Sequence, residues 1–155
     1  MEMLERLSRR QLETLLAVRK GETAGKGASL NEVARTLHVR PPSALEHLTA
    51  LEKLNMVTRY RGKSHLSPRG EACLVEYRRH HRVAENLFHR LGLSVADTHS
   101  AALEVDLALS HRTIDRLCRA EGHPTQCPHG EPIPPCHGAP SGGNDASHLL
   151  TGASR

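Results

Sequence analysis

The stretch Pro68–Leu91 constrains the fold most, because it predicts a single helix with a defined start and a defined end. Ser67 is a suitable N-cap, Pro68 suits the first helical position, and Gly92 favours termination. A helix of this length runs about 36 Å at a rise of ~1.5 Å per residue, which is the width of a small domain. The segments before and after it must therefore both pack against it.

Three shorter helices are predicted before this helix. A capping-box pattern begins a helix that extends to about Arg19, and residues 21–27 follow as a polar, glycine-rich loop. A second capping box at Ser29 begins a short helix. Pro41 begins a third helix, which Asn55 ends. Two short helices joined by a tight turn are the pattern of a helix-turn-helix.

A β-hairpin is predicted directly after the third helix. Residues 56–60 form its first strand, residues 61–64 its basic tip, and the return strand follows. Three helices and then a hairpin make a winged helix-turn-helix, which we assign to residues 1–67. The expected fold is mainly α, with this domain followed by a helical domain.

The winged helix offers two groups of side chains for double-stranded DNA. The N-terminal end of the third helix is the part that enters the major groove, and basic hairpin side chains suit backbone contacts. The candidate DNA contacts are Arg40, Pro42, Ser43, Glu46, His47, Arg59, Arg61 and Lys63. A winged helix used only for protein contacts is the alternative, and the carboxylate of Glu46 weakens affinity for phosphates unless it reads a cytosine amine.

The segment after the long helix predicts a helical dimerisation and metal-binding domain over residues 68–137. Capping patterns at Ser94 and Ser110 begin two further helices, and apolar residues over 95–117 exceed what one long helix can cover, which favours a homodimer. Residues 122–140 are rich in Pro, His and Cys and are expected to be irregular. The tail, residues 138–155, is expected to be disordered.

The composition permits nucleic acid and directs attention to cysteine and histidine chemistry. The formal net charge is +4 and the pI about 9.1. No run is apolar enough to span a membrane, and the charged N-terminus predicts a cytoplasmic protein. In a reducing cytoplasm the four cysteines, together with twelve histidines, favour metal or redox chemistry over structural disulfides. His81 and Glu85 are four residues apart, so they share one helix face and can share one ion.

Taken together, these motifs resemble the DtxR/MntR family of metal-dependent transcriptional regulators, in its ScaR-like Cys-Pro-His-Gly variant. The resemblance covers residue 1 to about 137 and is carried by Tyr60-Arg61-Gly62, Leu66-Ser67-Pro68-Arg69-Gly70, His81-x3-Glu85, His99, Leu109-Ser110 and Cys127-Pro128-His129-Gly130-x-Pro132-Ile133-Pro134. It implies a homodimer that binds a palindromic operator when Mn(II) or Fe(II) is bound. It also implies that the SH3-like domain of longer relatives is lacking here.

The resemblance implies a ligand set, from which this sequence departs. His81, Glu85, His99, Cys127 and His129 match family ligands, and Asp106 stands where the family usually has a ligating Glu. The positions where the family usually has its other primary ligands are occupied here by Ser8, Gln11, Leu103 and Leu107. We therefore expect metal binding to have moved to the matching set, with leucines filling the vacated site as core. Thiolate, imidazole and carboxylate donors favour Zn(II), Fe(II) or Co(II) over an all-oxygen Mn(II) site.

The remaining cysteines and histidines have less certain roles. Cys118 and Cys136, with His123 and His137, could add ligands to that site or form a second one, and Cys118 is equally consistent with a core residue. His80 and His89 are expected to be solvated, His111 to lie at the surface, and Cys73 to lie in the core.

Two other functions remain open at the level of sequence. A thiol-redox or iron–sulfur sensor could use Cys118, Cys127 and Cys136 on the same scaffold, although their spacing matches no standard cluster motif. A zinc hydrolase is the less favoured alternative, because the sequence shows no nucleophile–base–orienter set. We identify no catalytic residue and expect a metal-responsive repressor of metal-uptake or homeostasis genes.

Overall fold

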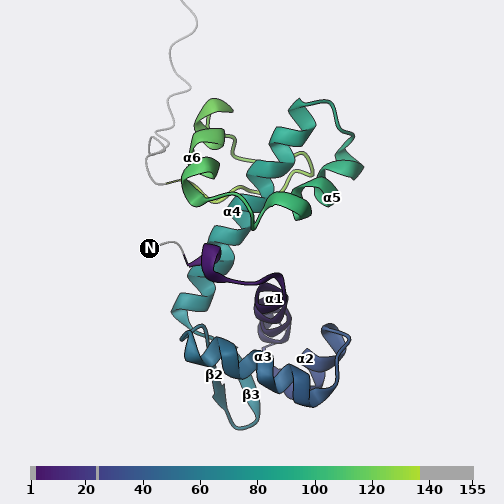
Figure 1. Ribbon diagram of the computed structural model, residues 1–155, viewed down its shortest axis with the longest axis vertical. Helices are drawn as coiled ribbons and strands as arrows, with labels where there is room; N and C mark the ends of the chain where they lie inside the picture. Colours follow the sequence, from purple (N-terminus) through teal and green to yellow (C-terminus); the bar gives the residue numbers. More distant parts are fainter. Residues whose placement is uncertain (1–2, 24, 137–155) are drawn as a thin grey trace, which may run out of the picture.

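The computed structural model describes residues 3–23 and 25–136, and its fold is mainly α, as predicted (Figure 1). The predicted tail and His137 lie outside the described residues. The elements are η1 (Leu4–Arg6), α1 (Arg9–Thr23), β1 (Ala28–Ser29), α2 (Leu30–Thr36), α3 (Pro41–Lys53), β2 (Val57–Tyr60), β3 (Lys63–Leu66), α4 (Pro68–Arg90), α5 (Val95–Val105) and α6 (His111–Ala120).

The first seven elements form the predicted winged helix. Strands β2 and β3 make the antiparallel hairpin, and β1 pairs with β3, so that the strand order is β1-β3-β2. Strand β1 was not predicted, because two residues are too short to show an alternating pattern. The predicted loop over residues 21–27 is partly wrong, since α1 continues through Thr23. Helix α3 ends at Lys53, two residues before the predicted Asn55.

Side-chain caps fix where the other helices begin. Ser29 and Glu32 form a complete capping box at α2. Ser67 accepts a hydrogen bond from the backbone N–H of Gly70 at the start of α4, and Ser94 and Ser110 cap α5 and α6 in the same way. The predicted helix starts from these residues are therefore confirmed.

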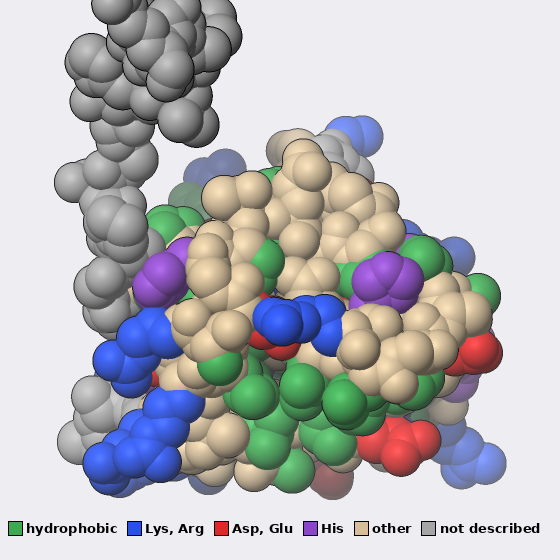
Figure 2. All heavy atoms as spheres, turned by 90° about the horizontal axis from the view of Figure 1, so that it is seen from above, with side chains coloured by type: hydrophobic (Ala, Val, Ile, Leu, Met, Phe, Trp, Pro, Cys, Tyr) green, Lys and Arg blue, Asp and Glu red, His purple; other side chains and the backbone are tan. Residues whose placement is uncertain are grey.

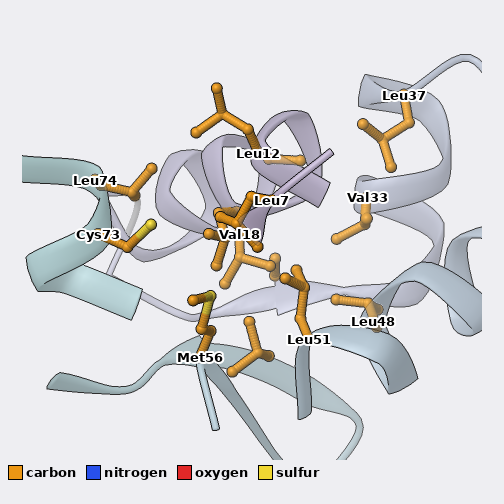
Figure 3. Packing of buried hydrophobic residues seen from close by; sticks show 14 of the residues in the cluster. Leu7, Leu12, Val18, Val33, Leu37, Leu48, Leu51, Met56, Cys73 and Leu74 are labelled. Carbon is orange, nitrogen blue, oxygen red and sulfur yellow. The ribbon is translucent and has the colours of Figure 1, made fainter. Parts of the chain in front are cut away.

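Two hydrophobic cores lie along α4. The larger core joins the winged helix to the N-terminal half of α4, where Cys73 and Leu74 pack toward α1 and Met56 (Figure 3). Cys73 is fully buried, as predicted. The smaller core joins the C-terminal half of α4 to α6 and the following loop, through buried Val83, Ile114, Cys118, Cys127 and Ile133. Helix α4 thus contributes side chains to both cores.

The segment after α6 is irregular but tightly hydrogen-bonded. The backbone N–H of Cys127 donates to the carbonyl of Glu131, and that of Ile133 donates to Thr125. Gly130, with a φ of 82°, donates to the carbonyl of Cys127 and closes the turn. These bonds and the burial of Ile133 fix the position of the turn against α4. Among the described residues, no helix is both long and apolar enough to cross a membrane.

Gly70 is required where the hairpin meets α4. A Cβ atom at this position would lie 2.2 Å from the carbonyl oxygen of Met56, which also accepts a hydrogen bond from the backbone N–H of Ser67. Alanine normally stabilises a helix interior relative to glycine, but here the side chain would meet backbone that has little room to move.

We predict that Gly70→Ala lowers the free energy of unfolding by about 1–3 kcal/mol, because the clash outweighs the helix-propensity gain. Urea denaturation followed by circular dichroism measures the change. Arg69→Ala, on the exposed side of the same turn, is the matched control and should change stability by less than about 0.5 kcal/mol. Equal stability of Gly70→Ala and wild type would contradict this account of the junction.

Candidate metal centre

Five side chains from three elements converge around one carboxylate oxygen. Glu85 Oε1 lies 3.1 Å from His81 Nε2, 3.2 Å from His99 Nδ1 and 3.5 Å from His129 Nδ1. His81 Nε2 and His99 Nδ1 are 2.9 Å apart, and the thiol of Cys127 donates a hydrogen bond to Glu85. The structure therefore brings together the whole set that the sequence singled out, which we call the Glu85 cluster.

The positions of these side chains follow from the local structure. His81 and Glu85 are one helical turn apart on α4 and are both buried. His99 projects from α5, and the turn closed by Gly130 carries Cys127 and His129. The ring of His99 meets that of His81 edge-on at 4.7 Å between centroids.

The Glu85 cluster gathers several atoms that can donate a lone pair to a metal ion. The carboxylate of Glu85 and one nitrogen of each neutral imidazole carry such lone pairs, and the sulfur of Cys127 gains ligand strength when its thiol loses the proton. Tetrahedral zinc with bonds of about 2.0–2.2 Å places neighbouring N and O ligands about 3.4 Å apart, close to the observed separations. The donor set and its spacing therefore fit a divalent transition metal.

Electrostatics in the Glu85 cluster support the ionised carboxylate. Burial raises the pKa of Glu85, but the hydrogen bond from Cys127 and the charge of His81 outweigh burial, so the pKa is lowered overall. Burial, followed by the hydrogen bond to Glu85, raises the pKa of the Cys127 thiol. Cys127 must therefore lose a proton before it can act as a ligand.

Asp106 lies behind the Glu85 cluster. Its Oδ2 is 2.9 Å from His81 Nδ1, the ring nitrogen that faces away from the cluster, and its Oδ1 is 2.5 Å from Arg9 Nη2. Burial raises the pKa of Asp106, and the hydrogen bonds from His81 and Arg9 more than reverse that effect. A carboxylate that orients an imidazole in this way is the usual second layer of a metal site.

Arg9 is a functional residue that the sequence analysis missed. It also donates to the carbonyl of Leu103 at 2.6 Å, so it ties the start of α1 to the end of α5. Ser8 and Gln11 bond to each other as the cap of α1. Leu107 packs against the larger core, but Leu103 is 39% exposed, so the prediction that both leucines fill a vacated site is wrong for Leu103.

Two further groups of potential ligands lie on α4 and α6. Cys118, His123 and Cys136 form one, and Glu76, His80 and His111 form the other. His80 is fully buried, so the prediction that it is solvated is wrong, and His111 is only partly exposed. The reason is that α6 covers this face of α4, a long-range contact that the periodicity of α4 alone does not reveal. His89 keeps an exposed contact with the Leu93 carbonyl.

The candidate DNA contacts lie on α3 and the hairpin. Arg40, Pro42 and Glu46 are exposed, whereas Ser43 and His47 are half-buried. On the hairpin, Arg59 pairs with Glu52 at 2.6 Å and Lys63 with Glu32 at 3.3 Å. Arg61, at the tip, lies over the exposed ring of Tyr60 at 5.1 Å. These ion pairs were not predicted, because each joins a strand to a helix and depends on how the two elements pack.

Comparison with known proteins assigns the class. Residues 67–135 match the family model described as "Iron dependent repressor, metal binding and dimerisation domain". The hypothetical protein SSo2273 from Sulfolobus solfataricus is 29% identical with a TM-score of 0.79, over 83% of this chain and 99% of that chain. No curated protein matches the chain.

Two larger solved structures have the same fold. IdeR of T. acidophilum is 27% identical with a TM-score of 0.60, over 86% of this chain and 63% of that chain. The metal-dependent transcriptional regulator MtsR is 25% identical with a TM-score of 0.69, over 81% and 59% respectively. The chain thus spans about three fifths of the length of these two regulators.

A winged helix joined by a long helix to a histidine-, cysteine- and carboxylate-lined site is an architecture that this chain shares with solved metal-dependent regulators. The family model that matches residues 67–135 and the solved structures agree with the resemblance to the DtxR family inferred from the sequence. Residues 67–135 correspond to the metal-binding and dimerisation domain of that family.

We predict that Arg9→Met lowers the free energy of unfolding by about 1–2 kcal/mol, because the buried Asp106 carboxylate loses a charged partner while Arg9 itself is partly solvated. Asp106→Asn should also destabilise the protein, and the double variant should lose less than the sum of the two single losses.

The control is Arg10→Met, which removes an exposed pair with Glu13 and should have an effect within about 0.5 kcal/mol. Strict additivity in the cycle, measured by urea denaturation of metal-free protein, would show that Arg9 and Asp106 are not coupled.

Proposed function

We propose that the protein is a metal-responsive transcriptional repressor that binds a palindromic operator as a metal-loaded homodimer. The observation that carries this proposal is the convergence of three imidazoles on the single oxygen Glu85 Oε1, with the sulfur of Cys127 within 4.8 Å of the ligand atoms of Glu85 and His129. Such a donor set is typical of a transition-metal site, and it lies in the chain segment that matches the family's metal-binding domain.

His81, Glu85, His99, Cys127 and His129 would hold the ion. Zn(II) or Fe(II) suits this mixed set of sulfur, nitrogen and oxygen better than Mn(II), which prefers oxygen ligands. An ion held by these ligands would neutralise the buried carboxylate of Glu85 and connect α4, α5 and the turn after Thr125. The thiol of Cys127 gives up its proton when it becomes a ligand.

Two connections join this site to the DNA-binding domain: the direct packing of α4 into the core of the winged helix, and a chain of contacts through His81, Asp106 and Arg9. His81 contacts the Glu85 cluster through one ring nitrogen and Asp106 through the other, and Asp106 pairs with Arg9 at the first residue of α1. Helix α1 packs against the recognition helix α3. A shift of the His81 ring is therefore transmitted to the winged helix through two hydrogen bonds and one rigid helix.

A second copy of the chain is the proposed partner of the α5 end of the molecule. Leu91 is 69% exposed, and Val95 and Leu103 on the adjoining helix are each 39% exposed. Figure 2 shows hydrophobic side chains gathered along one side of this end. Exposed apolar side chains in the segment that matches the family's dimerisation domain support a dimer through residues 95–117.

The dimer would present two recognition helices and two hairpins to DNA. Arg40, Pro42, Ser43, Glu46 and His47 occupy the N-terminal half of α3, which is the part of such a helix that faces the major groove. On the hairpin, Arg61 projects at the tip, while Arg59 and Lys63 exchange their carboxylate partners for phosphates.

We predict that Cys127→Ser and Glu85→Ala abolish metal-dependent operator binding, whereas Asp106→Ala only reduces it. The first two variants remove a donor, and the third loosens the orientation of His81, which commonly costs about 10–100-fold in metal affinity. Titration of each variant with Zn(II), Fe(II) and Mn(II), read by fluorescence anisotropy of operator DNA, measures the response.

Glu104→Ala removes an exposed carboxylate from α5 and is the matched control, with full response expected. Full metal response in Cys127→Ser combined with its loss in Asp106→Ala would place the ion around Asp106 and reject the Glu85 cluster.

The second functional prediction concerns DNA contacts. Arg61→Ala should weaken binding to all DNA sequences about equally and lower the slope of log K against log salt by about 1, because one phosphate contact is lost. Arg40→Ala should weaken binding to the operator. Arg116→Ala is the control: it also removes one positive charge, but from the exposed face of α6, outside the winged helix. It should leave the slope of log K against log salt unchanged. Wild-type binding by both Arg40→Ala and Arg61→Ala would reject the assigned DNA-binding surface.

A further inference from the structure

A second cluster of metal-ligating atoms lies at the far end of the segment that carries Cys127. Cys136 Sγ is 3.2 Å from His123 Nδ1, and Cys118 Sγ is 3.7 Å from the same nitrogen. All three donor atoms lie within 4.8 Å of one another. We call this group the Cys118 cluster; it shares no residue with the Glu85 cluster.

The backbone after α6 is shaped to bring these side chains together. The N–H of His123 donates to the carbonyl of Cys118 at 2.8 Å, which folds the chain back over the end of the helix. Gly122 and His123 both have positive φ values, 74° and 57°. The left-handed conformation is unfavourable for a residue with a side chain, so the fold tolerates a strained His123 that faces Cys118.

The spacing of the Cys118 cluster matches tetrahedral zinc. Bonds of about 2.3 Å to sulfur and about 2.0–2.1 Å to nitrogen place a thiolate and an imidazole ligand about 3.6 Å apart. The two observed separations, 3.2 Å and 3.7 Å, lie on either side of this value. Two sulfurs and one imidazole nitrogen are donors that Zn(II) prefers over harder ions.

A buried guanidinium lies near Cys118. Arg79 is 3% exposed and pairs with Asp115, and its charge opposes the effect of burial, which raises the pKa of the Cys118 thiol overall. Among the described residues, its Nε and Nη1 have no hydrogen-bond partner. Buried guanidinium groups require negative charge and acceptors, and a thiolate supplies both better than a thiol.

We propose that Cys118, His123 and Cys136 form a second, structural metal site that takes Zn(II). On binding, both thiols release their protons, two Zn–S bonds and one Zn–N bond form, and water completes the tetrahedron. The site fixes the end of the 125–136 segment to α6. Cys118 and His123 lie within the segment that matches the family model, and Cys136 lies one residue beyond it.

The site has a structural role because the segment it anchors also carries Cys127 and His129. Besides the backbone bonds of the turn, this segment is held by the small core around Val83 and Ile133 and by hydrogen bonds from Arg82 and Asn86 on α4. A metal cross-link from Cys136 to α6 would restrict the segment at the end opposite to Thr125. The Glu85 cluster therefore receives two of its donors from a segment that is fixed on both sides.

Cobalt(II) substitution of the full-length protein tests the proposal, because thiolate-to-cobalt charge transfer gives an ultraviolet absorption that imidazole and carboxylate ligands do not give. Cys127→Ser removes the sulfur of the Glu85 cluster, so thiolate absorption in this variant arises from Cys118 and Cys136. We expect Cys127→Ser to retain one equivalent of thiolate-bound Co(II). Adding Cys118→Ser and Cys136→Ser should abolish the absorption, whereas adding Cys73→Ala, in the other core, should leave it intact.

Thiol protection in the wild-type protein gives a readout that does not depend on folding of the variants. Maleimide labelling followed by peptide mass spectrometry should show Cys118 and Cys136 protected by Zn(II) and labelled after chelation. Absence of thiolate absorption in folded Cys127→Ser would overturn the proposal. So would a Cys118–Cys136 disulfide in protein purified with Zn(II), because oxidised sulfurs cannot act as thiolate ligands.

Discussion

The candidate sensor depends on one imidazole that uses both of its ring nitrogens. His81 Nδ1 faces the buried carboxylate of Asp106 at 2.9 Å, and Nε2 faces Glu85 and His99 at 3.1 and 2.9 Å. In a neutral imidazole only one nitrogen carries a proton, and a carboxylate partner favours that proton on Nδ1. Nε2 then presents a lone pair to Glu85 Oε1, which is also an acceptor. A cation between them resolves this conflict without moving either side chain.

Arg9 takes the place beside Asp106 where the family resemblance implies a metal ion. Ser8 and Gln11 cap α1 and do not face the carboxylate, and Arg9, between them, supplies a permanent charge to Asp106. A guanidinium cannot dissociate as a metal ion can. Arg9 therefore connects α1 to the end of α5 without a metal ion at Asp106.

The local features of the fold could be predicted from sequence because their causes are local. The caps at Ser29, Ser67 and Ser94 each involve a residue three positions away, and His81 and Glu85 share a face by helical spacing alone. That Cys127 would join them could be inferred only through the family resemblance, since no spacing argument connects residues so far apart. The burial of His80, the role of Arg9 and strand β1 escaped prediction for the same reason. Each depends on contacts between segments distant in the chain.

The turn after Thr125 shows why a small core needs polar or metal cross-links. Its buried apolar side chains are Cys127 and Ile133, within a core of five buried residues against which Cys136 also packs, whereas the core of the winged helix is much larger. Hydrophobic burial alone gives roughly 25 cal/mol per Å², so a segment with two buried side chains is held weakly against the entropy of ordering it. Arg82 on α4 contributes hydrogen bonds to the Pro132 carbonyl and to Glu131, on the exposed side of the turn. Potential metal ligands lie at both ends of the segment. Cys127 and His129 face α4 and α5, and Cys136 faces α6, so that cross-links at these positions would restrict the segment at both ends. Metal ligation by Cys127 and Cys136 would therefore fix the position of a turn that its small core holds only weakly.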